Sequence, residues 1–320
     1  MCAVERPNDA TPGAPVGCGR RQFRGESGKI RYPGAAESRG SDAGPASPPN
    51  PFFRRTEGFG MSPQTAGEAS GVREADAGGD EHDASVPSDP TTLARELLVA
   101  TKRGAATEPY ERALADADDD ALEAVREDRP TTLSFWLNCY NAGTQLLLDR
   151  RPDRYESRLR FVRFFHAPAV TVAGTDLPLD RIENGLLRAG RSKYGLGYVP
   201  KLLVTSFERR YALDSCDPRV HFALNCGAAS CPAVRAYEPD RVDDQLDLAT
   251  RAYLDETVSY DPESGVVRVP RVMLWFRGDF GGGAGIRAFL REYDTLPAGA
   301  EPAVRYESWD WSRAAGKFVE

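Results

Sequence analysis

The sequence predicts one helix-rich α+β domain around a small, mostly antiparallel sheet, preceded by a disordered tail. Residues 1–87 are dominated by Gly, Pro, Ala, Ser and charge, without apolar periodicity. Such a segment cannot bury enough apolar surface to offset the entropy of ordering, which predicts disorder. Residues 88–320 hold nearly all the Leu, Val, Tyr and Trp, and this length fits one globular domain. There, helical apolar spacing is interrupted by short strand-like segments.

The net charge of −7 is unevenly distributed. Residues 1–60 carry an excess of Arg, whereas the remaining chain is acidic. This acidity argues against nucleic acid or an anionic membrane as a partner. The acidic stretch after Met61 matches the domain, so we expect Met61 to be the true start of the protein. The N-terminus lacks the apolar core of a secretory signal, and no apolar run could span a bilayer, which predicts a cytoplasmic location.

The first helices are predicted from their caps. Asp89 and Pro90 form an N-cap and first-turn pair that opens a helix with Leu residues on one side. A second helix is predicted from about 108 to 127, although the run 116–120 could break it. A third helix is predicted from about Thr131 to Asp149.

The third helix carries two stripes. One is apolar and consists of Phe135, Cys139, Ala142 and Leu146. The other lies on a neighbouring face and is a row of mostly amide side chains, Ser134, Asn138, Asn141 and Gln145. Buried amides need hydrogen-bond partners. They therefore either hold the following loops in place or line a cleft.

Further elements follow the same logic. Val170–Leu179 is predicted as a hairpin, after which Asp180 and Glu183 resemble an N-cap and capping-box pair for a helix ending at Gly190. The Gly- and Tyr-rich segment 191–200 is typical of loops that cover sites. Clean alternation predicts a strand over Arg219–Asn225, at the centre of the sheet. Later elements are a helix over about 240–255, a strand over 265–270 and a short helix over about 286–293.

Several blocks of the domain resemble one family. They are Phe135-Trp-Leu-Asn-Cys-Tyr-Asn-Ala142, Ile182-Glu-Asn-Gly-Leu-Leu-Arg188, Asp217-Pro-Arg-Val-His-Phe-Ala-Leu-Asn-Cys-Gly-Ala-Ala-Ser-Cys-Pro232, then Trp275-Phe276 with Asp279-Phe280, and Trp309-Asp-Trp-Ser312. Over about residues 130–312 they are similar to the domain of unknown function family numbered 547.

The resemblance implies little about activity, because the family has none that is settled. Similar plant domains occur in chains with glutaredoxin-like modules, which associates the family with thiol chemistry. The family commonly has His after the Ile-Glu pair, where this chain has Asn184, so a catalytic role at that position would be lost or taken by another base. Cys139 has no counterpart role in the family.

The cysteines carry the sharpest hypotheses. Cys226 or Cys231, each beside a Gly-rich turn, could be a nucleophile with His221 as base. On an extended strand His221 and Cys226 would lie about 16 Å apart, which favours Cys231. Asn225 or Asn141 would then orient the imidazole. The redox alternative is a reversible Cys226–Cys231 disulfide.

A non-catalytic reading stays open as well. His221 and the buried amides would then form a satisfied polar core in a binding or scaffold module, and the cysteines would be packing residues. Cys139, on the apolar stripe, is expected to be an inert core thiol. Cys2 and Cys18 lie in the tail.

A metal site is not predicted. Cys216, His221, Cys226 and Cys231 are five residues apart at each step, whereas zinc ligands commonly come in pairs two to four residues apart. No phosphate-binding loop is present, and no cofactor is predicted.

The sequence therefore favours a thiol-dependent Cys–His hydrolase or transferase acting on an unknown small molecule or peptide, with the oligomeric state open. The candidate catalytic residues are Cys226, Cys231, His221 and Asn225. The candidate substrate-binding residues are Asn138, Asn141, Glu183 and Arg188.

Overall fold

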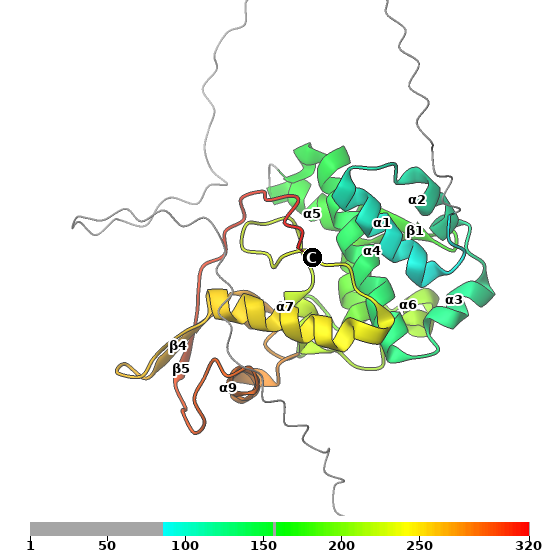
Figure 1. The fold of residues 1–320 in the computed structure, drawn as a ribbon. Helices are drawn as coiled ribbons and strands as arrows, with labels where there is room; N and C mark the ends of the chain where they lie inside the picture. Colours follow the sequence, from blue (N-terminus) through cyan, green and yellow to red (C-terminus); the bar gives the residue numbers. More distant parts are fainter. Residues whose placement is uncertain (1–85, 156–157, 320) are drawn as a thin grey trace, which may run out of the picture. The chain divides into compact units, whose positions relative to one another are not determined.

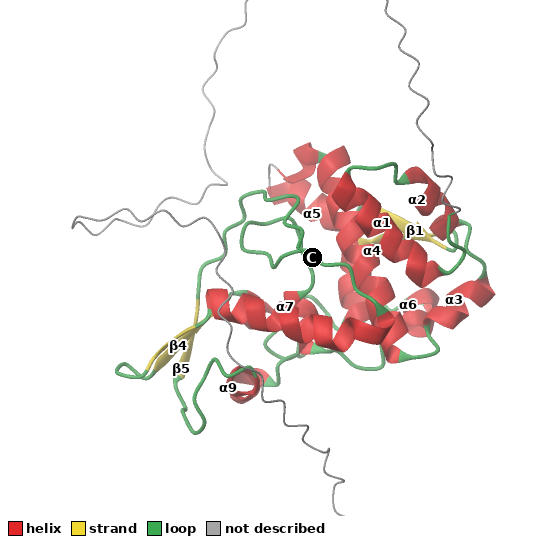
Figure 2. Cartoon of the chain, viewed as in Figure 1, coloured by secondary structure: helices red, strands yellow, loops and turns green. Residues whose placement is uncertain are grey.

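The computed structural model describes residues 86–155 and 158–319. Apart from residues 86 and 87, the predicted disordered tail lies outside the described residues, as does the suggested start at Met61. Helices predominate over two small sheets in the described chain (Figure 2), and this confirms the predicted α+β class. No helix in the described part of the chain is both long enough and apolar enough to cross a lipid bilayer.

Three helices open the domain: α1 (Pro90–Arg103), α2 (Glu108–Ala115) and α3 (Asp119–Val125). As predicted, the Asp89 side chain caps α1 by accepting a hydrogen bond from the Thr92 N–H, and Pro90 occupies the first turn. The predicted second helix is two helices. It breaks in the acidic run because Asp118 caps α3 by accepting from the Ala121 N–H.

Helix α4 (Arg129–Arg150) is the centre of the domain, and α1 lies against it (Figure 1). Every residue from 132 to 148 is buried. A helix enclosed on all sides has no solvent face, so its polar residues are buried with its apolar ones. Gly143 lets the β1 strand come close, because a Cβ there would lie 2.9 Å from the Cβ of Ala169.

The strands form two separate sheets. The predicted hairpin is present as β1 (Pro168–Val172) paired antiparallel with β2 (Thr175–Pro178). The second sheet has β4 (Val266–Val269) in the middle, with β3 (Ser259–Asp261) antiparallel and β5 (Ala303–Tyr306) parallel to it. The pairing is thus mostly antiparallel, as predicted.

The predicted central strand over Arg219–Asn225 is wrong. The segment begins as the 3₁₀ helix η4 (Pro218–Phe222), opened by Asp217, whose side chain accepts from the Arg219 N–H. All six residues from 220 to 225 are buried. The apolar alternation therefore does not mark a sheet face, because both sides of this segment are enclosed.

The predicted capping box at Asp180 is also wrong. Residues Arg181–Leu187 form a π-helix, η3, in which the Arg188 N–H bonds to the Glu183 carbonyl five residues earlier. The Asp180 side chain makes no cap. The wider π turn turns Glu183 toward Tyr140 instead of back toward the helix start.

The remaining elements frame these parts. They are η2 (Pro152–Tyr155), α5 (Arg158–His166), α6 (Ser206–Tyr211), η5 (Pro239–Arg241), α7 (Val242–Thr257), α8 (Val272–Trp275) and α9 (Gly282–Glu292). Helices α7 and α9 and strand β4 match the predicted positions to within a few residues.

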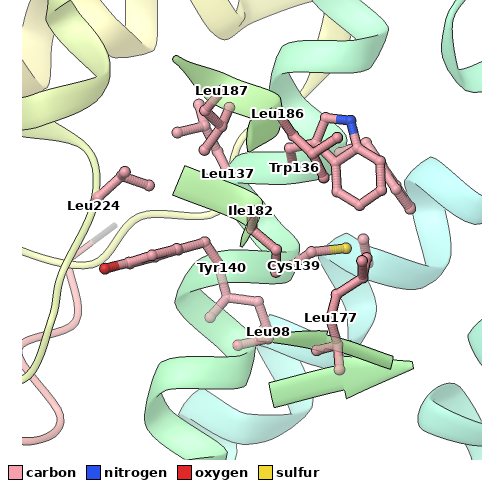
Figure 3. Close-up of a cluster of buried hydrophobic side chains, with 14 of the residues drawn as sticks. Leu98, Trp136, Leu137, Cys139, Tyr140, Leu177, Ile182, Leu186, Leu187 and Leu224 are labelled. Carbon is pink, nitrogen blue, oxygen red and sulfur yellow. The ribbon is translucent and has the colours of Figure 1, made fainter. Parts of the chain in front are cut away.

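Two apolar clusters lie side by side in the domain. The first surrounds α4, and the second packs β4 against α9. Segment η4 belongs to both, because Val220 is buried in the first cluster and Phe222 in the second. In Figure 3, Cys139 points into the first cluster beside Leu177, whereas Tyr140 points the opposite way, toward Leu224.

The C-terminal residues 307–319, here called the strap, run back over the loop that follows η4. The Ala229 N–H donates to the Ser312 carbonyl at 2.8 Å, and the Val234 N–H donates to the Lys317 carbonyl at 2.7 Å. The Lys317 ammonium donates to the carbonyls of Ala229 and Cys231. The strap therefore fixes the backbone of residues 227–234.

Two amides of α4 each clasp a distant backbone segment. Asn141 donates to the Ala223 carbonyl at 3.0 Å and accepts from the Asn225 N–H at 3.0 Å. Asn138 makes the same pair of bonds with Tyr237, at 2.8 and 2.9 Å. Of the two sequence alternatives, the structure supports loop-holding amides.

We predict that Asn141→Ala lowers the free energy of unfolding by about 2–4 kcal/mol, because it leaves a buried donor and a buried acceptor unpaired. Asn138→Ala should cost a similar amount. Urea unfolding measures both, with Asp149→Ala at the exposed end of α4 as a control that should change stability by less than about 0.5 kcal/mol. If either variant kept the stability of the parent but lost ligand binding, that result would instead support the predicted role of Asn138 and Asn141 in binding a substrate.

Candidate functional site

Two thiols meet in the loop after η4. The Sγ atoms of Cys226 and Cys231 are 2.8 Å apart, and the Cys226 N–H donates to the Cys231 Sγ at 3.2 Å. Both thiols are free, Cys226 partly exposed and Cys231 buried. Gly227 makes the turn possible, with φ at 88° and Leu148 only 2.7 Å from where a Cβ would lie.

The two thiols differ in acidity. The pKa of Cys226 is raised well above its usual value, mainly by its hydrogen bond to Cys231 and by burial. The pKa of Cys231 is lowered although burial opposes this, because the Cys226 thiol and the N–H groups of Ala228 and Cys226 stabilise its thiolate. The pair therefore loses its first proton readily and retains its second.

The thiol pair opens into a cavity of about 160 Å³ with mostly aromatic walls. Cys226, Cys231 and His221 all line it, and so do Tyr140 and Glu183. The other walls are Phe165, Leu224, Pro232, Val272, Trp275, Phe276, Trp309 and Trp311. Its lining comes from α4, η3, η4, α8 and the strap, so it exists only in the folded domain.

Glu183 is the acidic group of this cavity. Its side chain accepts a hydrogen bond from the Tyr140 hydroxyl at 3.3 Å. Burial raises the pKa of Glu183 to about 7, with Arg188 acting in the opposite direction. A carboxyl group with this pKa exchanges its proton near neutral pH.

His221 lies in the cavity wall with a different partner from the one predicted. Its Nε2 is 2.9 Å from Oδ2 of Asp279, and its ring stacks on Phe276 with centroids 4.1 Å apart. Burial lowers the pKa of His221 despite the carboxylate, which favours the neutral imidazole. The residue that orients the imidazole is Asp279, which sequence reasoning missed, although Asp279-Phe280 stood among the resembling blocks.

Asn225 is not placed to orient the imidazole. Its side chain donates to the Pro232 carbonyl at 2.6 Å and accepts from the Gly227 N–H at 2.8 Å. These bonds close the thiol loop. Asn141 and Asn138, as described above, bond to backbone and do not line the cavity.

Arg188 is buried behind the cavity. Its guanidinium pairs with the Asp279 carboxylate, with Nε–Oδ2 at 2.6 Å and Nη2–Oδ1 at 3.2 Å, and both side chains are fully buried. It also lies 4.3 Å from the centroid of the Phe276 ring. Burial acts to raise the pKa of the Asp279 carboxyl, but the hydrogen bonds from His221 and Arg188 lower it to about 2. Asn184 accepts a hydrogen bond from Arg188.

One cluster within the described residues has metal-ligating side chains. The ligand atoms of Cys216, His221 and Asp279 lie within 4.8 Å of one another. The Asp279 carboxylate is already shared by Arg188 and His221, and an adjacent guanidinium disfavours a dication. Burial also raises the pKa of Cys216, which keeps it a thiol. The four residues that the sequence analysis considered as possible metal ligands therefore lie in two groups, Cys216 with His221 and Cys226 with Cys231.

The other cysteine of the described chain, Cys139, is fully buried in the first apolar cluster. Burial raises the pKa of its thiol far above the usual value. This environment is that of a core thiol. Cys2 and Cys18 lie outside the described residues.

Comparison with known proteins gives one match. Residues 126–254 match the family described as protein of unknown function, DUF547. No curated protein and no solved structure matches the chain. The matched region contains α4, η3, η4 and both thiols of the pair, whereas Asp279, Trp275 and the strap lie beyond it. Over residues 126–254 the chain is therefore similar to the DUF547 family of proteins of unknown function.

Proposed function

We propose that the domain is a dithiol–disulfide redox centre whose working residues are Cys226 and Cys231. The observation that carries the proposal is the 2.8 Å contact between the two Sγ atoms in the lining of one cavity. A thiolate beside a second thiol is the arrangement that thiol–disulfide exchange requires, because one sulfur attacks the substrate and the other resolves the mixed disulfide.

The exchange can be written in two balanced steps. In the first, Cys226, the more exposed of the two, passes its proton to the Cys231 thiolate and attacks a substrate disulfide, forming a mixed disulfide and releasing a thiolate to solvent. In the second, Cys231 gives its proton to the Glu183 carboxylate and attacks Cys226 Sγ. The Cys226–Cys231 disulfide forms and the second half of the substrate leaves as a thiolate. Two electrons pass from the protein to the substrate, and an external thiol restores the pair.

The backbone around the thiols favours this chemistry over acyl transfer. The Cys226 and Ala228 N–H groups bond to the thiol sulfurs, and the Gly227 N–H bonds to Asn225. These are the groups that an oxyanion hole in this loop would use. With the N–H groups so occupied, the loop stabilises a thiolate rather than a tetrahedral oxyanion.

A Cys–His hydrolase or transferase is the second candidate. It is favoured by one observation, namely that His221, bonded to Asp279, lines the same cavity as both thiols. A neutral imidazole oriented by a carboxylate is the base such an enzyme needs.

The redox proposal predicts that mild oxidation with excess oxidised glutathione removes two hydrogens and links Cys226 to Cys231. Peptide mass spectrometry of the digested protein locates the bond. Cys226→Ala and Cys231→Ala should each abolish it, because each removes one sulfur. The matched control Cys216→Ala should leave it intact. Two thiols that stay free at equilibrium while the protein remains folded would contradict the proposal.

Glu183 should make stability depend on pH around neutrality. Because its pKa is raised to about 7 in the folded protein, the stabilisation is present below its unfolded value and is lost as pH rises through about 7. We predict that the stability of Glu183→Gln relative to the parent rises by about 3 kcal/mol between pH 4.5 and pH 8.5. Urea unfolding at both pH values tests this, and a difference that is the same at the two pH values contradicts it.

The two candidate functions are separated by His221→Gln. If the domain is a redox centre, the variant still forms the Cys226–Cys231 disulfide, while hydrolysis of a p-nitrophenyl ester is negligible in both proteins. Ester turnover with an acyl-enzyme on either thiol, lost in the variant, would instead support the hydrolase or transferase.

A further inference from the structure

The aromatic walls of the thiol cavity include a cluster of three tryptophans. The Trp275 ring centroid is 5.1 Å from that of Trp309 and 5.4 Å from that of Trp311, and the last two are 5.9 Å apart. All three rings are only partly buried. With Tyr140 and Phe276, they give the cavity several π systems that carry partial negative charge on their faces.

The charged groups of the cavity have one sign. Glu183 and the two thiols line it, groups that carry a negative charge when ionised, and neither Lys nor Arg is among the described residues of its walls. The nearest guanidinium, that of Arg188, is fully buried and neutralised by Asp279. His221 in the wall is neutral for the reason given above. A ligand that enters this space therefore meets anions and aromatic faces together.

This combination selects a cation. An ammonium group within about 6 Å of an aromatic face is attracted by the ring, most strongly by Trp, and more so when water is excluded. A buried carboxylate adds a direct ion pair. The volume, about 160 Å³, is that of roughly five water molecules, so only a short chain fits.

We propose that this cavity takes the ammonium end of a short aminoalkyl disulfide, which places the substrate sulfur at Cys226. This inference names the substrate class of the redox centre and rests on that proposed function. The tryptophans and Glu183 hold the ammonium, and the thiol pair in the same lining attacks the disulfide.

The test compares three disulfides of similar size on the reduced protein. They are cystamine, which is cationic, bis(2-hydroxyethyl) disulfide, which is neutral, and dithiodiglycolate, which is anionic. Intact mass spectrometry follows the oxidation of the thiol pair, with rates corrected for the reaction of each disulfide with free glutathione. Cystamine should react about tenfold faster than the neutral disulfide, and the anion should be slowest.

Glu183→Gln should remove most of the preference for cystamine. Glu256→Gln is the matched control, because it removes an acidic charge from the neighbouring cavity and not from this one, and it should keep the preference. Equal rates for the three disulfides, or a faster neutral disulfide, would overturn the inference and leave the redox centre standing.

A second measurement separates the two proposals. In the Cys226→Ala/Cys231→Ala variant no exchange can occur, so tryptophan fluorescence reports binding alone. Propylammonium should change the fluorescence at lower concentrations than propanol does. If no disulfide reacts with the parent, the redox proposal is wrong. The fluorescence titration then tests on its own whether the cavity binds an ammonium group. A response to propanol equal to that to propylammonium overturns it.

Discussion

The buried ion pair between Arg188 and Asp279 connects the two apolar clusters of the domain. Arg188 follows η3 in the first cluster, and Asp279 precedes Phe280 in the second. Removing one partner of such a pair leaves an uncompensated buried charge, at a cost of about 3–5 kcal/mol. The same carboxylate holds His221, so the relative position of the clusters and the orientation of the imidazole depend on one interaction. The loop 191–200 covers it, with the Leu196 carbonyl accepting from the Gly278 N–H at 2.7 Å.

The cavity is assembled from segments that are far apart in sequence, and each segment supplies a different property. The matched region brings both thiols of the pair, Glu183 and His221. The segments beyond it bring Asp279 and the three tryptophans. The proposed sulfur chemistry and the proposed selection of a cation thus depend on different parts of the chain.

Local patterns in the sequence predicted the local structure well. Caps located α1, the amide spacing located the enclosed helix α4, and alternation with Gly located the β1–β2 hairpin. The same alternation failed at Arg219–Asn225, because burial on both sides also produces apolar residues at every second position. The pairing of Cys226 with Cys231 was among the sequence alternatives, and the turn at Gly227 brings their Sγ atoms to 2.8 Å.

The parts of the site that the sequence did not reveal depend on long-range packing. His221 and its partner Asp279 are 58 residues apart, and no local spacing relates them. The π turn that directs Glu183 toward Tyr140 has no signature in the residues that form it. Trp309 and Trp311 stood in a resembling block, but nothing in that block indicated which cavity they would line.

The strap has a consequence for biosynthesis. The Lys317 ammonium that bonds the Cys231 carbonyl is 86 residues further along the chain. At a synthesis rate of roughly 5–20 residues per second, it leaves the ribosome about 4–17 s after the cysteine does. Until then the loop lacks the contacts that fix it, and a nascent chain presents both thiols to cellular oxidants. The order of synthesis gives the new chain an interval in which the surroundings of both thiols are set by the environment and not by the fold.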